Sequence, residues 1–383
     1  MSNRQVMATP RHVDIAITGK CNLACQYCFY ADEMTARGDL PTERWLDFFA
    51  ELGRLGVMTV CLTGGEVFTR PDLFELIDGL IAKRMRYRLL SNGTLISEQT
   101  LAQFEMGKRR QRLDSIQVSI DGSASEVHDR SRPKSFGRAL RGVKLLKEAG
   151  FPLTVRVTVN RYNVDDLEKV AQLLLEEIGL ANFSTNEAYT CGGTGRSEGG
   201  IRLSAGQREQ AMQTLARLEA RYPGRISASA GPQVMARELK TMEELMAAGQ
   251  TSLPGRGTLS ACGGVFNTIA VLHDGTLVPC HNLSALHLGR VGVDDLQQVW
   301  LYHPVMIALR QRREIPLSAL ASCEGCRYQG FCTGGCPGGA LQANGDFNSR
   351  NPADCYRILK GEDPWVALPG ETAAGEARVR HDR

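Results

Sequence analysis

Six short apolar runs alternate with longer segments of helical periodicity between residue 12 and about residue 187, and this alternation constrains the fold more than any other feature. Strands are expected at 12–18, 57–63, 86–91, 113–120, 152–159 and 180–185, and helices at 42–55, 71–84, 97–106, 135–149, 164–178 and 204–222. We expect Thr42 to cap the first helix and the second helix to start near Pro71. Repeated strand–helix units predict a parallel sheet, either open or closed into a barrel.

Polar or glycine-rich residues follow every expected strand. After the first strand come three cysteines; the later strands are followed by "TGGEVF" (63–68), "SNGT" (91–94), "SIDG" (119–122), Asn160, and Asn186 with Glu187. In βα barrels the carboxyl ends of the strands carry the active site. We therefore expect the functional site at this end of the sheet.

The three cysteines after the first strand, Cys21, Cys25 and Cys28, have the spacing C-x3-C-x2-C. Thiolates are the standard protein ligands of iron–sulfur clusters, usually four to a cubane, so three leave one iron open to another ligand. A structural zinc site normally needs four ligands, and His12 and Asp32 are poor candidates for the fourth. Twelve cysteines in a chain with no secretory signal favour metal binding over disulfides.

The motifs "CNLACQYCFY", "LTGGE", "SNGT" and "SIDG" followed by "HDRSR" resemble those of the radical S-adenosylmethionine (SAM) enzymes. The resemblance implies that the open iron chelates the amino and carboxylate groups of SAM, and that SAM is cleaved to methionine and a 5′-deoxyadenosyl radical that abstracts a hydrogen atom. It also implies that Glu66 receives the methionine ammonium, whereas Arg132 binds either the SAM carboxylate or a structural carboxylate. The SAM-binding residues expected by resemblance are Tyr27, Phe29, Gly64, Gly65, Glu66, Ser91, Asn92, Ser119, Asp121 and Arg132.

A second group of seven cysteines follows residue 260, and its spacing resembles the SPASM extension of radical SAM enzymes, which holds two auxiliary [4Fe–4S] clusters. By this resemblance the first auxiliary cluster takes Cys262, Cys280 and Cys336, and the second takes Cys323, Cys326, Cys332 and Cys355. A pair of zinc ribbons is the alternative, because C-x2-C pairs are common in zinc sites.

Two cysteines and one histidine remain. Cys61 lies in an apolar strand and is expected to be a small buried hydrophobe. In sulfatase-maturing relatives an eighth cysteine completes the first auxiliary cluster, but residues 251–261 contain none. Either Cys191 supplies that ligand or the cluster keeps an open iron, which we favour. His281 is expected to hydrogen-bond near the cluster; its counterpart in sulfatase maturases is an aspartate, which argues against that activity.

The resulting expectation is an α/β chain with a partial (β/α)6 TIM-type barrel of radical SAM type, followed by a small cysteine-rich SPASM domain. The expected divisions are a tail (1–11), the radical SAM core (12–222), a linker or bridging helix (223–259), the SPASM domain (260–360) and a polar tail (361–383). The expected activity is that of a radical SAM oxidoreductase that abstracts hydrogen from a ribosomally made peptide and forms a side-chain cross-link. The alternatives are a dehydrogenase acting on an aminoglycoside-type sugar and a non-catalytic iron–sulfur or zinc scaffold.

Charge and hydropathy guide the expected partners and location. The 45 basic and 42 acidic residues are interspersed, which gives no nucleic-acid footprint. No apolar run approaches the ~20 residues that span a bilayer, so a cytoplasmic enzyme without a membrane partner is expected. About a dozen residues precede the first strand, too few for a leader-binding module. A separate leader-binding protein and an external electron donor of flavodoxin or ferredoxin type are therefore expected.

Overall fold

The computed structural model describes residues 6–35, 38–188 and 200–363. Its centre is one ten-stranded sheet in the order β10-β9-β8-β1-β2-β3-β4-β5-β6-β7. The strands are β1 (His12–Thr18), β2 (Thr59–Gly64), β3 (Arg86–Ser91), β4 (Leu113–Ser119), β5 (Leu153–Val159), β6 (Phe183–Glu187), β7 (Ile226–Ala228), β8 (Thr268–Val271), β9 (Thr276–Val278) and β10 (Gly289–Arg290). Neighbouring strands from β1 to β7 are parallel, which confirms the predicted partial barrel.

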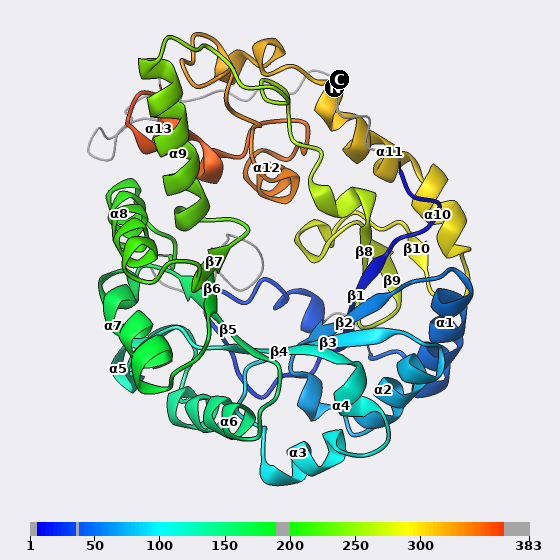
Figure 1. Cartoon of the computed structure of the whole chain (residues 1–383). Coiled ribbons are helices and arrows are strands. Elements are labelled where there is room, and N and C mark those ends of the chain that lie inside the picture. The colour runs from blue at the N-terminus through cyan, green and yellow to red at the C-terminus, as the bar shows by residue number, and fades with distance from the viewer. Residues whose placement is uncertain (1–5, 36–37, 189–199, 364–383) are drawn as a thin grey trace.

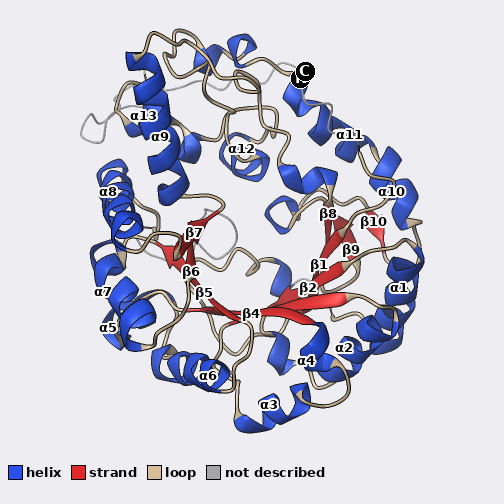
Figure 2. Cartoon of the chain, in the orientation of Figure 1, coloured by secondary structure: helices blue, strands red, loops and turns tan. Residues whose placement is uncertain are grey.

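The helices surround the curved sheet on its outer side, as Figure 1 shows, and Figure 2 shows the strands gathered inside them. The helices of the barrel are α1 (Thr42–Arg54), α2 (Leu73–Ala82), α3 (Glu98–Phe104), α4 (Arg109–Arg112), α5 (Ser125–Ser131), α6 (Phe136–Glu148), α7 (Leu167–Ala171) and α8 (Ala205–Arg221). The later helices are α9 (Pro232–Ala247), α10 (Leu296–Tyr302), α11 (Pro304–Gln311), α12 (Pro337–Asn344) and α13 (Tyr356–Leu359).

The two faces of the sheet differ in polarity. Val13, Ile15 and Ile17 of β1 are fully buried in the main hydrophobic core, because alternate residues of a strand point to the same face. The opposite face of the sheet carries Asp14, which pairs in register with Cys61, and Cys61 pairs in turn with Arg88. The inner face of the barrel, which we call the lumen, is therefore polar.

The cysteine-rich segment contributes strands to the barrel sheet, which the sequence reading did not predict. β8 pairs in parallel with β1, and β9 and β10 continue from it as antiparallel strands. These strands are two to four residues long, and β7 has three residues. Runs this short carry almost no periodic signal, so their pairing is decided by tertiary contacts.

Two predicted local details differ from the structure, and a third agrees. Thr42 does not cap α1; Pro41 holds the cap position, and the Thr42 hydroxyl donates to Asp72 instead. The second helix starts at Leu73, two residues after Pro71, close to the expected start. The single helix expected over 164–178 is a short 3-10 turn, α7 and a π-helical turn (Gln172–Glu177) in succession.

Candidate active site

Cys21, Cys25 and Cys28 lie on the loop after β1, which we call the cysteine loop (residues 19–32). Glycines make room for its first residues. A Cβ atom on Gly64 would lie 2.3 Å from the Thr18 carbonyl oxygen, and one on Gly65 would lie 2.1 Å from the Lys20 carbonyl oxygen. The backbone N–H of Gly65 donates to Thr18 O at 2.8 Å. The "GGE" motif therefore allows the β2 loop to pack directly on the cysteine loop.

Glu66 joins the loops that follow β2 and β3. Its fully buried carboxylate accepts hydrogen bonds from the Ser91 hydroxyl at 2.8 Å and from the backbone N–H of Asn92 at 2.7 Å. The Asn92 side chain donates to Asn22 Oδ1 of the cysteine loop at 2.9 Å. Burial raises the pKa of Glu66, whereas these donors lower it. The "SNGT" motif thus also holds the cysteine loop in place.

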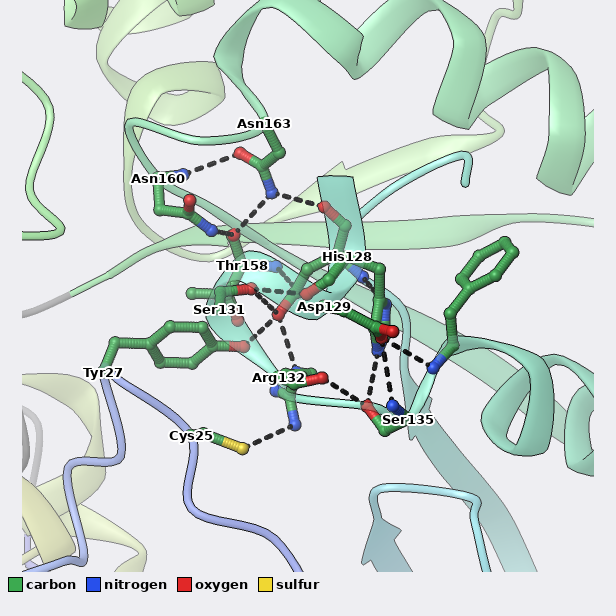
Figure 3. A network of polar contacts seen from close by, with 12 residues as sticks. Cys25, Tyr27, His128, Asp129, Ser131, Arg132, Ser135, Thr158, Asn160 and Asn163 are labelled. Carbon is green, nitrogen blue, oxygen red and sulfur yellow. Dashed lines mark hydrogen bonds and ion pairs between the residues drawn. The ribbon is translucent and has the colours of Figure 1, made fainter. Parts of the chain in front are cut away.

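The Asp121 carboxylate, just after β4, holds the other side of the cysteine loop. Figure 3 shows its partners Tyr27, Arg132 and Thr158 in one network of polar contacts. Oδ2 accepts hydrogen bonds from the Tyr27 hydroxyl and, at 2.6 Å, from Arg132 Nε; Oδ1 accepts from the backbone N–H of Thr158 at 2.8 Å. The Arg132 guanidinium also lies over the Tyr27 ring, and its Nη1 is 3.8 Å from Cys25 Sγ. Loops from three strands therefore hold the cysteine loop in place.

The three thiols are partly buried and close to one another. Burial raises the pKa of Cys21 to about 11, and the nearby Cys25 and Cys28 act in the same direction. Burial also raises the pKa of Cys25, opposed by the Arg132 charge. Metal binding requires the deprotonated thiolates, so a bound cluster would have to offset the cost of charging Cys21 and Cys25 in this buried position. The donor set suits an iron–sulfur cluster held by one loop.

A second set of thiols combines residues from distant segments. Burial raises the pKa of Cys280 to about 12, and the neighbouring Cys262 and Cys336 raise it further. Arg312, which is fully buried, holds the surrounding backbone through donation to the carbonyl oxygens of Ser260 and Phe347. Cys262 itself has a φ of +47°, an unusual conformation for a residue other than glycine.

A third set of thiols, Cys323, Cys326, Cys332 and Cys355, lines one small pocket. Burial raises the pKa of Cys332 to about 12, with the other three thiols adding to the shift. Four convergent thiols around a void fit a cluster with four protein ligands. Within the part of the chain that the structure describes, no three His, Cys, Asp or Glu side chains are arranged to hold a single metal ion.

The remaining predicted residues lie in varied surroundings. Cys61 faces the lumen, half-buried between Asp14 and Arg88, rather than sitting in an apolar core as expected, because β2 turns alternate residues toward the polar face. Cys191 lies outside the described residues. His281 packs against Phe29 with ring centroids 6.3 Å apart, and its Nε2 is 3.4 Å from the Val271 carbonyl oxygen.

The expected SAM-binding residues fall into three groups. Gly64, Gly65, Glu66, Ser91 and Asn92 form the contact between the β2 and β3 loops and the cysteine loop. Tyr27, Asp121 and Arg132 bond to one another, which is the structural alternative considered for Arg132. Phe29 is 40% exposed, and Ser119 lies on the lumen face of β4. Sequence reasoning missed Tyr30, whose hydroxyl lies 2.8 Å from His273 Nδ1 and joins the cysteine loop to the β8–β9 turn.

Comparison with known proteins agrees with this arrangement. The model of the radical SAM superfamily matches residues 15–174, and that of an iron–sulfur cluster-binding domain, SPASM, matches residues 262–327. The chain is a radical SAM protein with a SPASM domain. Its cofactors are accordingly [4Fe–4S] clusters and SAM. No helix among the described residues has the length and apolar character needed to cross a membrane.

Curated relatives of this radical SAM/SPASM chain cover most of its length. The AdoMet-dependent heme synthase of Methanosarcina barkeri is 27% identical over 91% of this chain and 97% of its own. The PqqA peptide cyclase of Ruegeria pomeroyi is 27% identical over 94% of this chain and 91% of its own. Among solved structures, Streptococcus suis SuiB bound to the precursor peptide SuiA superposes with a TM-score of 0.71 at 16% identity, over 92% of this chain and 77% of SuiB. That likeness establishes a shared fold.

Proposed function

We propose that this radical SAM enzyme modifies a ribosomally made peptide by oxidation, forming a cross-link at a side-chain carbon. The observation that carries the proposal is the cysteine loop, held by the loops after β2, β3 and β4 above a polar lumen. Bound at Cys21, Cys25 and Cys28, the first cluster would supply reductive cleavage of SAM to a 5′-deoxyadenosyl radical. The chain itself supplies the placement of SAM and the exclusion of water.

The residues around the loop have separable roles in this proposal. Glu66 binds the methionine ammonium of SAM through acceptor capacity that its three present donors leave free, because a carboxylate has about four lone-pair sites. Asp121 and Arg132 keep Cys25 and Tyr27 oriented. The Asp121 side chain is fully buried and that of Arg132 is 11% exposed, so this ion pair stabilises the loop geometry through the tertiary structure.

The two later thiol sets would hold auxiliary clusters. We assign Cys262, Cys280 and Cys336 to one and Cys323, Cys326, Cys332 and Cys355 to the other, with the SPASM domain spanning residues 260–360 after a core of 12–222 and a linker of 223–259. The mutual proximity of the thiols within each set supports this assignment. These clusters would accept the electron that the oxidised substrate loses.

Peptide substrates are favoured by two relatives whose names specify a peptide, the PqqA peptide cyclase and SuiB with its precursor SuiA. A second candidate function is AdoMet-dependent heme synthesis, favoured by the M. barkeri relative that the chain matches over 97% of its length. The oxidation of a small sugar is a third possibility on the same scaffold. A genomic neighbour encoding a short peptide would favour the first, and a neighbouring set of tetrapyrrole or sugar enzymes would favour the others.

The test of radical chemistry is the combined variant Cys21→Ala, Cys25→Ala and Cys28→Ala, reconstituted anaerobically and treated with dithionite. It should retain auxiliary iron and release no 5′-deoxyadenosine, whereas Cys61→Ala, outside every proposed cluster, should release it as the wild type does. 5′-Deoxyadenosine from the triple variant would refute the assignment. Incubation of the wild-type enzyme with the precursor peptide encoded by the neighbouring gene should then yield a peptide product lighter by two hydrogen atoms.

Metal analysis tests the thiol sets independently of activity. Three [4Fe–4S] clusters imply about twelve irons and twelve labile sulfides per chain, against two or three metal ions if the later cysteines bind zinc. Stoichiometric zinc without labile sulfide in the reconstituted protein would overturn the auxiliary clusters and revive the zinc-scaffold alternative.

Two protein partners belong to the proposal. A flavodoxin- or ferredoxin-type donor would reduce the first cluster, and a separate small protein would deliver the peptide by its leader. The outermost strands β7 and β10 are where an added strand could extend the sheet. Binding of a labelled precursor to the enzyme with and without the candidate partner tests this. Tight, leader-dependent binding by the enzyme alone would contradict the need for a delivery protein.

A further inference from the structure

Arg156 is a cation on the lumen face of the barrel. Its β5 neighbours Val155 and Val157 are fully buried in the outer core, so Arg156 points to the opposite face. In register it lies between Ser119 of β4 and Ser184 of β6. These strands line the inside of the arc in Figure 2. Arg156 therefore projects into the same space as Ser119. It lies two residues before Thr158 on β5, the residue whose backbone N–H binds Asp121.

Arg156 has no counter-ion among the described residues. Its Nε donates to Ser184 Oγ at 2.7 Å, and no ion pair with a carboxylate is formed within the described ranges. Burial lowers the pKa of Arg156, with no opposing charge to restore it. Arg132 pairs with Asp121 and Arg208 pairs with Glu187, whereas the buried Arg312 donates to backbone carbonyl oxygens. Arg156 has neither kind of partner among the described residues, and its one hydrogen bond there is to a hydroxyl group. Because a desolvated charge without a partner is costly, its retention calls for a ligand.

The adjacent strand offers a second unsatisfied group. Asn186 follows Ser184 by two residues on β6, so both face the lumen, and its register partner is Thr158 of β5. Asn186 Oδ1 is buried and has no hydrogen-bond partner among the residues that the structure describes. Buried polar atoms are nearly always paired in native proteins. A guanidinium without a counter-ion among the described residues and an amide oxygen without a partner there thus lie on neighbouring strands, one layer apart.

We propose that Arg156 and Asn186 form a substrate subsite in the lumen, in which Arg156 binds a carboxylate of the substrate and Asn186 Oδ1 accepts a hydrogen bond from a neighbouring N–H. A peptide carries both groups, as an acidic side chain or C-terminal carboxylate beside a backbone amide. The planar guanidinium binds a carboxylate through two parallel N–H donors. The inference rests on the proposed function and narrows its substrate to peptides with a carboxylate at or next to the modified residue.

The test measures binding to the reconstituted holoenzyme with SAM, by anaerobic equilibrium dialysis. The probes are three blocked pentapeptide pools that are identical except for a central glutamate, a central glutamine, or a central glutamine with a free C-terminal carboxylate. Each is measured with the wild type, Arg156→Gln, Asn186→Ala and the control Arg86→Gln. Arg86 lies on β3, which β4 separates from β5, and Asp114 already pairs with it. SAM affinity is measured for all four proteins.

The wild type and Arg86→Gln should retain a carboxylate pool at least ~10-fold better than the neutral pool, as expected for a charge-assisted hydrogen bond. Arg156→Gln should lose this preference, and Asn186→Ala should weaken both carboxylate and neutral pools. The carboxylate pool that binds more tightly shows whether the subsite takes a side-chain carboxylate or a C-terminal one. Equal retention of all pools by the wild type, or a preference that survives in Arg156→Gln, would overturn the proposal. The proposal would also be overturned if Arg156→Gln lost SAM affinity but kept the preference for a carboxylate pool. Arg156 would then bind the methionine carboxylate of SAM.

Failure of this subsite is distinguishable from failure of the proposed function. If the pools bind without preference while a precursor peptide is still modified, only the subsite is wrong. If the glutamate preference depends on Arg156 but no peptide is modified, the subsite stands and the peptide cross-linking activity is wrong.

Discussion

Arg132 and Asp121 form an ion pair, with Nε 2.6 Å from Oδ2, in which the aspartate is fully buried. The same carboxylate accepts a hydrogen bond from the Tyr27 hydroxyl, so one buried charge connects the β4 loop to the cysteine loop. Removal of one partner leaves the other charge buried and uncompensated.

Asp121→Asn should therefore lower the free energy of unfolding by ~3–5 kcal/mol, the usual cost of breaking a buried pair. The matched control is Asp114→Asn, whose partner Arg86 is 44% exposed, and it should cost below ~1 kcal/mol. Denaturant titration of both variants under anaerobic conditions measures the difference. Similar losses in the two variants would contradict a special role for the Asp121 pair.

His128 should make the stability depend on pH. Its Nδ1 accepts the backbone N–H of Asp121 at 3.0 Å, so the ring proton is on Nε2, which lies 3.0 Å from Ser135 Oγ. Burial lowers the pKa of His128 to about 4; nearby Asp121 and Asp129 favour the charged ring, and Arg132 opposes it. The unfolded chain, with an ordinary histidine pKa of about 6.5, binds more protons between pH 6.5 and 4.

The folding stability should thus fall by about 3 kcal/mol as the pH drops from 6.5 to 4 because of this residue. His128→Asn, which can still accept the Asp121 N–H through its amide oxygen, should flatten that part of the profile. His287→Asn, at an exposed histidine, is the control and should leave the profile unchanged. Unfolding titrations across this pH range are the measurement, and an unaltered slope in His128→Asn would exclude the explanation.

Glu66→Gln should weaken SAM binding by about 10- to 150-fold, the value of a charge-assisted hydrogen bond to the methionine ammonium. Glutamine can still accept from the Asn92 N–H and donate to the Ser91 hydroxyl, so the loop contact and the iron content should survive. Equilibrium dialysis with SAM and iron analysis give the two readings. Glu187→Gln, which removes a buried carboxylate elsewhere, should keep the SAM affinity. An unchanged affinity in Glu66→Gln would limit Glu66 to holding the loops together.

Arg350→Met should lower the reduction potential of the cluster proposed at the third thiol set. Arg350 Nη1 lies 2.9 Å from Cys355 Sγ, and hydrogen bonds to the ligating sulfur favour the more negative, reduced cluster. If this hydrogen bond strengthens by ~1 kcal/mol when the cluster is reduced, its loss should lower the reduction potential by ~40 mV. Spectroscopic redox titration should find Arg327→Met, at a surface arginine paired with Glu362, unchanged. A potential that is equal in both variants would refute the effect of Arg350.

Much of the site was accessible from the sequence because its parts are local. The three thiols of the cysteine loop and the glycines at 64 and 65 each stand directly after a strand, and parallel strands bring such ends to one edge. The roles of Tyr27 and Arg132 were harder to predict. Their common partner Asp121 is separated from Tyr27 by 94 residues, and no periodicity relates such positions.

By itself, the sequence determined the strands and helices of the barrel, since periods of 2 and 3.6 residues are written into adjacent positions. It also determined the spacing of the thiols within each local motif. Only the tertiary structure decided that β8 pairs with β1, that Cys61 faces Asp14 in the lumen, and that Arg156 has no counter-ion in the described part of the chain. The physical reason is that these features depend on which distant segments become neighbours when the sheet curves, and on which charges are then removed from water together.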